Sequence, residues 1–576
     1  MLLLSALEIF FTWASIALTL VGIGSIVLAR FCKNYSLFEA FWMGLAVSVT
    51  LLEIWSLLLP ITSSTTILLF CAGLLGLLAN RSTLFSRLKT TVQSSRWLIL
   101  PAIAIVLFIA LRSVGPCDYY DTGLYGAASV RWIQTFPAVP GLANLHGRLG
   151  YNSSVFLCIA ALGQGPWQEL GFHLFTGFLL AALWATLLPA CARIISRTLT
   201  APSDWFHTIL AVPAFFWTTR SRIVGTQTDE PAAVVALIAT GIFFADLCHN
   251  NREDQANSQP MRLVVAATLF PLAVVFKEST AVFALLAWCL VFRRIWQTSL
   301  STRLFHLAAA LLFSTVLLLP WFARSIILSG YPLYPATLFA FPVPWTTPLS
   351  AANWYALGVQ SWGRIPNAPF RDTRGLHWLG GWLHHALRNR ASFQVPLAIS
   401  LAGLAIVLTL CFRGGKPRPS CPWLSLLIPS LAGILFWFAA SPDTRFAQFA
   451  IWTAAATLGT WGIMCLDLQR GRSHSRLVLA ALLMSLLWCL ISLGWKEPIQ
   501  AIRGVQQPPP LPKPALIVRR TLSGLAVHVP AQGNQCWDAP LPCTPYFDDS
   551  LRLRDDSSLR WGFTSEGRAA ELQKSW

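Results

Sequence analysis

Charged side chains are scarce in this chain. Asp, Glu, Lys and Arg together make up 11% of its 576 residues, whereas a soluble domain has about 25%. The sequence also has no P-loop, no dinucleotide-binding fingerprint, no HExxH motif and no GxSxG motif. The scarcity of charge excludes an ordinary soluble domain, and the missing phosphate-binding loop argues against an ATP-driven engine within the chain.

Apolar sequence takes the place of charge. Hydrophobic residues make up 55% of the chain, and its mean hydropathy is +0.58. Apolar runs of about 20 residues recur, which is the length that a helix needs to cross a bilayer, and they are continuous rather than alternating, which excludes a porin-like barrel. The pattern predicts an all-α polytopic membrane protein with about fourteen transmembrane helices. The predicted spans lie near residues 6–29, 36–59, 61–79, 97–113, 170–192, 205–219, 230–248, 262–276, 279–292, 303–322, 393–412, 422–440, 447–466 and 476–495.

The polar loops between these spans are of two kinds that alternate along the chain. Plain Lys and Arg gather in one kind, and the positive-inside rule assigns those loops to the cytoplasm. Acids, bases and aromatics mix in the other kind, which then faces outward. This segregation explains the net charge of +18 without nucleic-acid binding, for which no basic-aromatic module is present. The cytoplasmic loops contain, among others, Arg30, Lys33, Arg81, Arg87, Lys89, Arg96, Arg193, Arg197, Arg293, Arg294, Arg303, Arg413, Lys416, Arg418, Arg470, Arg472 and Arg476.

We expect three parts along the chain. The two large outer loops carry apolar and aromatic residues that are typical of amphipathic segments at a membrane surface, and we expect the apolar stretch from Val155 to Leu162 to lie there. In the polar tail, Cys536 and Cys543 lie seven residues apart and can form a disulfide if the tail is outside the cytoplasm. The parts are residues 1–96, extra N-terminal transmembrane helices; residues 97–495, a transmembrane core that includes outer loops 114–169 and 323–392; and residues 496–576, a small extracytoplasmic tail.

The first outer loop holds the densest cluster of polar side chains. Asp118 and Asp121 lie three residues apart, so on one helical turn their carboxylates would face the same way. Such a pair suits a general base or a divalent metal ion, which makes Asp121 and Asp118 candidate catalytic residues. The alternative is structural, with Asp121 as a helix N-cap. Further substrate-binding candidates in this loop are Tyr125, Arg131, His146, Arg148 and Asn152.

A second outer cluster surrounds the start of the span at 230–248. Arg220 and Arg222 lie on the outer side against the positive-inside trend, so they need partners, and phosphate is a natural one. Asp229 and Glu230 are candidates for substrate binding. Their alternative role is structural, because acids stabilise a helix N-terminus through its dipole.

Four more charged residues at outer positions are candidates. Lys277 sits in a tight connection between two spans, where we expect it to contact an anion; the alternative is a local pair with Glu278. Arg324, directly after a span, can hold a lipid phosphate through two hydrogen bonds or extend to the bilayer headgroups. Asp443 and Arg445 complete the candidates for substrate binding.

Several stretches of the chain are similar to a family of uncharacterised bacterial multi-pass membrane proteins with a GT-C-like core. The layout, in which a span leads outward into an acidic loop followed by many hydrophobic spans, resembles the GT-C superfamily of membrane glycosyltransferases, which includes the protein O-mannosyltransferases and the aminoarabinose transferases of lipid A. Where the family carries His after the DTGLY stretch, this chain has Gly126. The similar stretches are DTGLYGAASVRWIQ, VPGLANLHGRLGYNSS, RSIILSGYPLYP, SPDTRFA and CWDAPLPCTPYF.

The resemblance implies a GT-C-like helical bundle in the bacterial inner membrane that uses a polyprenyl-phosphate-linked sugar on the extracytoplasmic face. The acceptor would be a glycan, a lipid or a protein. In such enzymes a carboxylate of the first outer loop acts as base or metal ligand, and Asp121, and secondarily Asp118, occupy that place. No cofactor is certain, and a divalent metal ion is an open alternative. The rival hypotheses are a flippase or transporter of lipid-linked glycans and a polymerase or ligase of surface polysaccharide.

Overall fold

The computed structural model describes residues 1–32, 34–196, 201–219, 223–248, 260–298, 300–368, 370–412, 421–470 and 504–567. Ten helices in this part of the chain are long and apolar enough to cross a membrane. Every predicted span within these residues coincides with a helix; the span at 476–495 lies outside them. The helices of the bundle, which we call the long helices, are α1 (Leu2–Phe31), α2 (Leu37–Leu58), α3 (Ser63–Ala79), α4 (Arg81–Ser95), α5 (Ile99–Ser113), α9 (Phe175–Ser196), α10 (Pro202–Thr219), α11 (Asp229–Cys248), α13 (Pro260–Phe276), α14 (Ala281–Trp296), α15 (Leu300–Ser329), α18 (Val395–Phe412), α19 (Leu427–Ala440) and α20 (Gln448–Arg470). In the ten candidates, α4 and α5 count together as one, and α3, α10 and α13 are not included.

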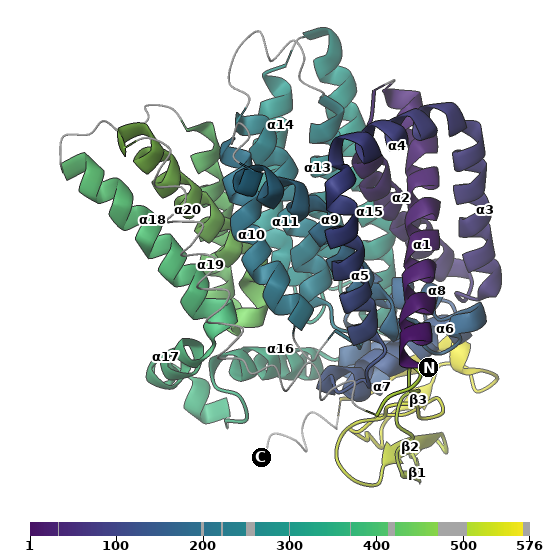
Figure 1. The fold of residues 1–576 in the computed structure, drawn as a ribbon. Helices are drawn as coiled ribbons and strands as arrows, with labels where there is room; N and C mark the ends of the chain where they lie inside the picture. Colours follow the sequence, from purple (N-terminus) through teal and green to yellow (C-terminus); the bar gives the residue numbers. More distant parts are fainter. Residues whose placement is uncertain are drawn as a thin grey trace.

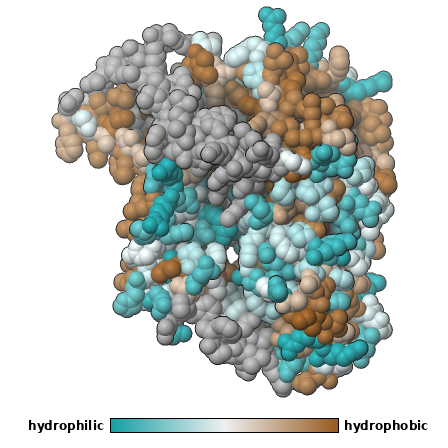
Figure 2. All heavy atoms as spheres, turned by 60° about the horizontal axis from the view of Figure 1, so that its bottom comes forward, coloured by the Kyte–Doolittle hydropathy of each residue, from teal (hydrophilic) through white to brown (hydrophobic). Residues whose placement is uncertain are grey.

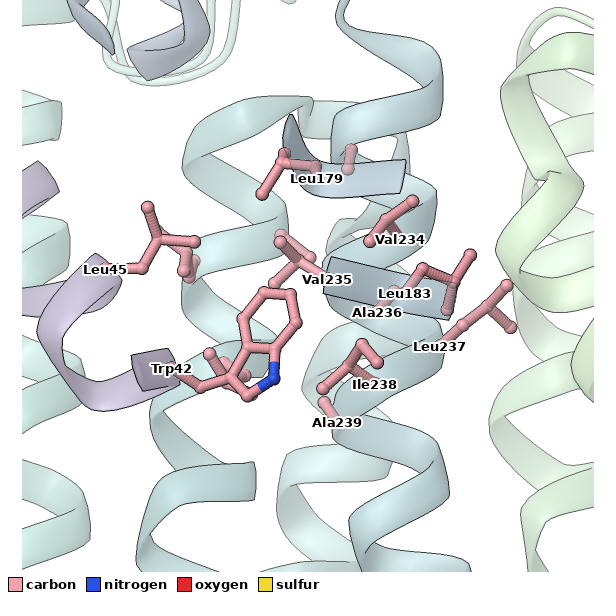
Figure 3. Close-up of a cluster of buried hydrophobic side chains, with 14 of the residues drawn as sticks. Trp42, Leu45, Leu179, Leu183, Val234, Val235, Ala236, Leu237, Ile238 and Ala239 are labelled. Carbon is pink, nitrogen blue, oxygen red and sulfur yellow. The ribbon is translucent and has the colours of Figure 1, made fainter. Parts of the chain in front are cut away.

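The long helices form one bundle with two different ends (Figure 1). The large loops between helices and the C-terminal strands lie at one end, which we call the loop end, and α4 lies at the other, which we call the basic end. The interior between the ends is apolar. Figure 3 shows Trp42 of α2 directed toward Val235 and Ile238 of α11, and Trp42 is 1% exposed. Packing between buried apolar side chains thus holds the long helices together, and this fixes the positions of the loops that connect their ends.

Small residues let the N-terminal helices approach closely. A Cβ atom on Gly24 of α1 would lie 1.8 Å from the carbonyl oxygen of Ala40 in α2, and one on Gly22 would lie 2.0 Å from that of Gly73 in α3. Close backbone approach at small residues is a common way for helices to associate in lipid. The N-terminal helices therefore pack tightly on each other through α1.

Ion pairs at the basic end join the ends of helices. Each pair links two helices that meet there, and each has a short contact between a guanidinium nitrogen and a carboxylate oxygen. The pairs are Arg193–Asp204 at 2.7 Å, Arg262–Glu39 at 2.7 Å and Arg294–Asp246 at 2.7 Å.

Shorter helices build the loop end. The first outer loop contains α6 (Ala127–Thr135), α7 (Leu142–Leu145) and α8 (Ser154–Leu162), and the second contains α16 (Leu349–Arg364) and α17 (Trp378–Arg388). The expectation that Val155 to Leu162 lies at the membrane surface is wrong, because every residue of α8 from Ser154 to Ala161 is buried, and α8 contacts α2, α3 and α6. By contrast, α16 and α17 each combine buried residues with large exposed apolar side chains such as Leu357 and Leu383, as the amphipathic interpretation predicts.

The tail adds β-structure, which the all-α prediction did not include. It forms two antiparallel sheets of two strands each, one from β1 (Leu516–Arg520) and β2 (Ala526–Pro530) and one from β3 (Arg552–Leu553) and β4 (Phe563–Thr564). A disulfide joins Cys536 and Cys543, which the sequence had left open. Buried tail residues share one hydrophobic cluster with the first outer loop, in which Phe563 packs edge-to-face on Trp132 with ring centroids 5.8 Å apart. The tail is thus part of the loop end rather than a separate appendage.

Candidate functional site

The chain around Asp121 adopts an unusual helical turn. A π-helical segment, Thr122–Gly126, follows Asp121 and leads into α6. Such segments are rare, and they occur often at functional sites. The side chain of Asp121 makes no capping hydrogen bond, so the N-cap interpretation is wrong. Its carboxylate instead accepts a hydrogen bond from the Tyr119 hydroxyl at 3.3 Å.

A neighbouring loop holds this turn from one side. The Thr122 hydroxyl accepts a hydrogen bond from the Thr226 amide at 2.9 Å and another from the Thr226 hydroxyl at 3.1 Å. A Cβ atom on Gly126 would lie 1.9 Å from the Thr226 hydroxyl oxygen. A histidine at position 126 therefore does not fit this backbone unless Thr226 shifts.

The predicted pairing of Asp118 with Asp121 on one helical face is wrong. Residues 116–119 are not helical, and Asp118 is exposed. The second carboxylate near Asp121 comes from α11 instead: Asp229, 7% exposed, acts electrostatically with Asp121 on the Tyr119 hydroxyl. Burial first, and then these two carboxylates, raise the pKa of Tyr119 well above its ordinary value, against the opposing charge of Arg445. Tyr119 therefore remains a hydrogen-bond donor.

Two cations from distant helix ends meet at this place. Lys277, in the connection from α13 to α14, forms an ion pair with Asp229 and lies 4.2 Å from the ring centroid of Phe446. Lys277 therefore pairs with a carboxylate of α11 rather than with Glu278, and its contact with a substrate anion stays a prediction. Arg445, before α20, is held by Asp443 at 3.0 Å and donates to the Tyr119 hydroxyl at 3.5 Å.

Arg148 brings a third cation from within the first outer loop. It donates no hydrogen bond and forms no ion pair to any residue in the described part of the chain. Burial alone would lower the pKa of Arg148, but Tyr151, Tyr546, Asp121 and Tyr125 together hold it above the ordinary value. Arg148 is thus a charged guanidinium that has no hydrogen-bond or ion-pair partner among the described residues and lies within electrostatic reach of several tyrosines and Asp121.

The tyrosines around Arg148 come from separate segments. The rings of Tyr125 and Tyr151 pack edge-to-face at 5.7 Å. Burial raises the pKa of Tyr151 to about 12, with Arg148 opposing the shift and Asp121 and Glu278 adding to it. The buried Tyr151 hydroxyl has no hydrogen-bond partner within the described residues. These phenols stay neutral and can bind a polar ligand.

His146 lies at the edge of the same group. It is 2% exposed, and its ring packs on Tyr546 of the tail at 5.2 Å and near Tyr355 of α16 at 6.2 Å. Burial and the charge of Arg148 lower the pKa of His146 to about 3, so the imidazole is neutral at physiological pH. A neutral His beside Arg148 leaves the guanidinium as the local positive charge.

The other predicted site residues lie elsewhere or have structural partners. Arg131 pairs with Asp538 of the tail and, at 3.8 Å, with Glu169. Asn152 and Arg324 are buried and bonded to each other, and the Asn152 amide also donates to the carbonyl of Trp321 at 2.7 Å. Arg324 is therefore not a free cation at the outer boundary.

For three further candidates the structure gives little beyond their position in the chain. Glu230 follows Asp229 in the first turn of α11, as the helix-dipole interpretation predicts. Arg220 and Arg222 lie outside the described residues. For the predicted metal site at Asp118 and Asp121, the described part of the chain holds no group of three or more His, Cys, Asp and Glu residues that is arranged to bind a metal ion.

Sequence reasoning missed several residues of this group. Tyr119, Tyr151 and Tyr546 surround Asp121 and Arg148, and Glu278 lies close enough to act on Tyr151, with one buried carboxylate oxygen that has no hydrogen-bond partner within the described residues. A signal was present in the distribution of tyrosine. The chain has nine tyrosines, and all except Tyr35 belong to segments of the loop end.

The loop end presents many polar residues at its surface. Figure 2, with that end turned forward, shows hydrophilic residues over much of its coloured surface, one hydrophobic patch at the lower right, and hydrophobic residues toward the upper edges of the view. The Asp121 group lies at this end, between the connections of long helices, the first outer loop and the tail. We call Tyr119, Asp121, Arg148, Asp229, Lys277 and Arg445 the carboxylate–cation cluster.

Comparison with known proteins gives a family and no activity. The model of a family described as a domain of unknown function (DUF8201) matches residues 7–452, which is most of the chain. No curated protein and no solved structure matches the chain.

Proposed function

The chain belongs to the DUF8201 family, and we propose that it is a membrane glycosyltransferase of the GT-C type. It moves a sugar from a polyprenyl-phosphate donor to an acceptor at the loop end, with Asp121 as the general base. The proposal includes about fourteen spans, a bacterial inner membrane, and a loop end that faces away from the cytoplasm. The loops at the basic end carry Lys and Arg, including Arg81, Arg87, Lys89 and Arg96 in and directly after α4, which supports this orientation.

The carboxylate–cation cluster is the observation that carries the proposal. Asp121 accepts a hydrogen bond from Tyr119, and Arg445 reaches the same Tyr119 hydroxyl. Arg148 lies within electrostatic reach of Asp121 and has no protein anion of its own among the described residues. A carboxylate beside an unpaired cation fits a reaction that removes a proton at one point and releases an anion at another.

The reaction step follows from these roles. Asp121 takes the proton of an acceptor hydroxyl, and the resulting oxygen attacks the anomeric carbon of the donor sugar. A new carbon–oxygen bond forms there, while the bond between the anomeric carbon and the phosphate oxygen breaks and its electron pair leaves with the polyprenyl phosphate. Arg148 and Arg445 stabilise the charge on that leaving phosphate, because preorganised cations favour a transition state in which anionic charge develops.

The position of the cluster decides which donor is suitable. Nucleotide sugars are made in the cytoplasm, and in the proposed orientation the cluster faces the other side. A polyprenyl-phosphate sugar carries both the sugar and the phosphate across the membrane and keeps them at its surface. A bilayer-anchored donor also matches a cluster that lies at the ends of membrane-spanning helices.

The distribution of ion pairs favours an enzyme over a transporter. A transporter would have polar groups near the middle of the bilayer, often at broken helices. The ion pairs among the described residues lie at helix ends or in loops, either at the basic end or at the loop end. A polymerase or ligase of surface polysaccharide shares the chemistry of transfer and is separated by its product, a joined chain rather than one added sugar.

A transfer assay tests the proposal directly. The full chain is reconstituted in proteoliposomes with labelled polyprenyl-phosphate sugars and a bacterial envelope extract as acceptor, with and without EDTA to measure the metal requirement. We expect label to leave the lipid for the acceptor and free polyprenyl phosphate to accumulate. Movement of intact donor between leaflets without release of polyprenyl phosphate would instead establish the flippase hypothesis.

Labelling tests the orientation independently of activity. A cysteine placed at the exposed position 118 should react with a membrane-impermeant maleimide in intact cells, and one at the exposed position 89 of the basic end should react only after the cells are opened. Mass spectrometry of the labelled peptides separates the new cysteines from the native ones. The reverse pattern would contradict the proposal.

A further inference from the structure

The tail touches the residues on both sides of Asp121. The side-chain amide of Gln535 donates a hydrogen bond to the carbonyl of Tyr120 at 2.9 Å, and the Tyr120 hydroxyl donates one to the side-chain oxygen of Asn534 at 2.5 Å. Beyond Asp121, the amide of Trp537 donates to the carbonyl of Gly123 at 2.9 Å. Residues more than 400 positions away along the chain thus bracket the candidate base.

The indole of Trp537 lies directly on the helical turn that follows Asp121. A Cβ atom on Gly123 would lie 2.4 Å from the Trp537 ring, so glycine leaves the space in which the ring packs. Trp537 itself has a φ of 42°, a conformation that bulky residues seldom adopt. An unfavourable backbone conformation persists where surrounding contacts impose it, and such positions cluster at functional sites.

A closed loop holds Trp537 in this position. Cys536 and Cys543 are 1% and 2% exposed and joined by the disulfide, and Trp537 and Asp538 lie between them. Asp538 pairs with Arg131 of α6, the helix that continues from the turn of Asp121. The tail is fixed further back as well, because His173 bonds to the carbonyl of Pro509 at 3.0 Å.

We propose that Trp537, in the disulfide-closed loop 536–543, is a positioning residue that holds the carboxylate of Asp121 in its reactive place. It acts through Gly123 and the π-helical turn and does not touch the reacting atoms. Thr226 holds one side of that turn, and the tail holds another. For its catalytic consequence this inference depends on the proposed function, whereas its effect on the turn can be measured without any assay of transfer.

The first test measures the turn itself. Hydrogen–deuterium exchange is followed by mass spectrometry in the full chain for Trp537→Ala, with Trp561→Ala as the matched control, because Trp561 is a 46% exposed tail residue away from these contacts. We expect exchange of residues 120–127 to rise about tenfold in Trp537→Ala only, as expected for a segment that opens locally. Unchanged exchange in that segment would overturn the proposal.

The second test measures transfer per folded molecule. We expect Trp537→Ala to lower kcat about 10²-fold, because a base displaced by about 1 Å can cost that much, and Trp537→Phe to restore most of it by keeping a ring on Gly123. Gly123→Ala, which displaces the ring from the opposite side, should resemble Trp537→Ala, and so should Cys536→Ser combined with Cys543→Ser. A Trp537→Ala protein with faster exchange in the turn but full kcat would overturn the positioning role.

The two tests separate the two proposals. If exchange rises in the turn but the wild-type protein transfers no sugar from any polyprenyl-phosphate donor, the contact of Trp537 with the turn is supported and the glycosyltransferase function is rejected. If the wild-type protein transfers sugar and Trp537→Ala changes neither exchange nor kcat, the function stands and the positioning role is rejected.

Discussion

The two ends of the bundle use the same charged residue types in different ways. At the basic end, Arg193, Arg262 and Arg294 each bond to an acid at the end of a neighbouring helix, and each pair closes locally. At the loop end, charges from the first outer loop, α11, the connection after α13 and the segment before α20 converge, and Arg148 has no ion-pair partner within the described residues. Ion pairs in which each charge has a protein partner stabilise helix ends, whereas a cluster that contains a cation without such a partner can bind a ligand.

The contrast between the two ends predicts that substitution of Asp121 causes the largest loss of sugar transfer. Asp121→Asn removes the proposed base while keeping the shape of the side chain, so we expect sugar transfer to fall about 10³-fold, within the range for general bases, with unfolding temperature nearly unchanged. Asp118→Asn is the matched control because Asp118 is exposed and outside the cluster. Full activity in Asp121→Asn would remove the base assignment.

The second-largest loss of sugar transfer is expected when the charge of Arg148 is removed. Arg148→Met keeps a long apolar side chain and removes the charge, and we expect kcat to fall about 10²-fold, as for the loss of one electrostatic stabiliser of a transition state. Arg364→Met serves as control, since Arg364 also lies at the loop end but donates to the carbonyl of Thr373 at 2.7 Å. Equal losses in the two variants would mean that the effect is structural.

The third prediction compares the loss of one cation at each end of the bundle. Lys277→Met should lower transfer about tenfold, less than a fully desolvated stabiliser, because Lys277 already pairs with Asp229. Arg294→Met at the basic end should instead cost about 3 kcal/mol of stability, since it leaves the Asp246 charge without its partner, and should leave transfer per folded molecule unchanged. Thermal unfolding and kcat, measured on both variants, test whether the ends differ as proposed.

The smallest effect concerns His146 and pH. Its pKa in the folded protein is about 3, against 6.5 when unperturbed, so between these values the unfolded chain binds more protons. Stability should therefore fall as the pH drops from 6.5 toward 3, by at most about 1.4 kcal/mol per pH unit from this one group. His146→Gln should flatten the pH dependence of the unfolding midpoint; identical slopes would contradict the assignment.

Hydropathy was sufficient to predict the helices, because a membrane span is defined by its own length and composition. It was not sufficient for α8. A short apolar run of this kind has no periodicity that separates a surface segment from a buried one, and its burial depends on α2, α3 and α6 packing around it. The spacing of Cys536 and Cys543 indicated only that a disulfide was possible, because whether it forms depends on the compartment that the tail occupies.

The site was predictable as a set of loops but not as a set of partners. Asp121, Lys277 and Arg445 were identified from their positions beside predicted spans. The pairing of Asp121 with Asp118 failed because the chain before Tyr120 is not helical, and spacing is informative only within a regular element. Arg324 failed because its partner Asn152 is 172 positions away, and no local pattern encodes such a contact.

The hydrophobic cluster that contains Trp132 and Phe563 also determines how late in synthesis the loop end can complete its folding. Ribosomes make the first outer loop long before residue 563, and earlier parts of a chain fold while later parts are still being made. The first loop must therefore wait, with apolar surface uncovered, until the last segment has reached the same side of the membrane. In a chain that ends before residue 563, the edge of Trp132 that packs on Phe563 would lack its partner from the tail, so the last residues to be made complete the packing of one of the first loops.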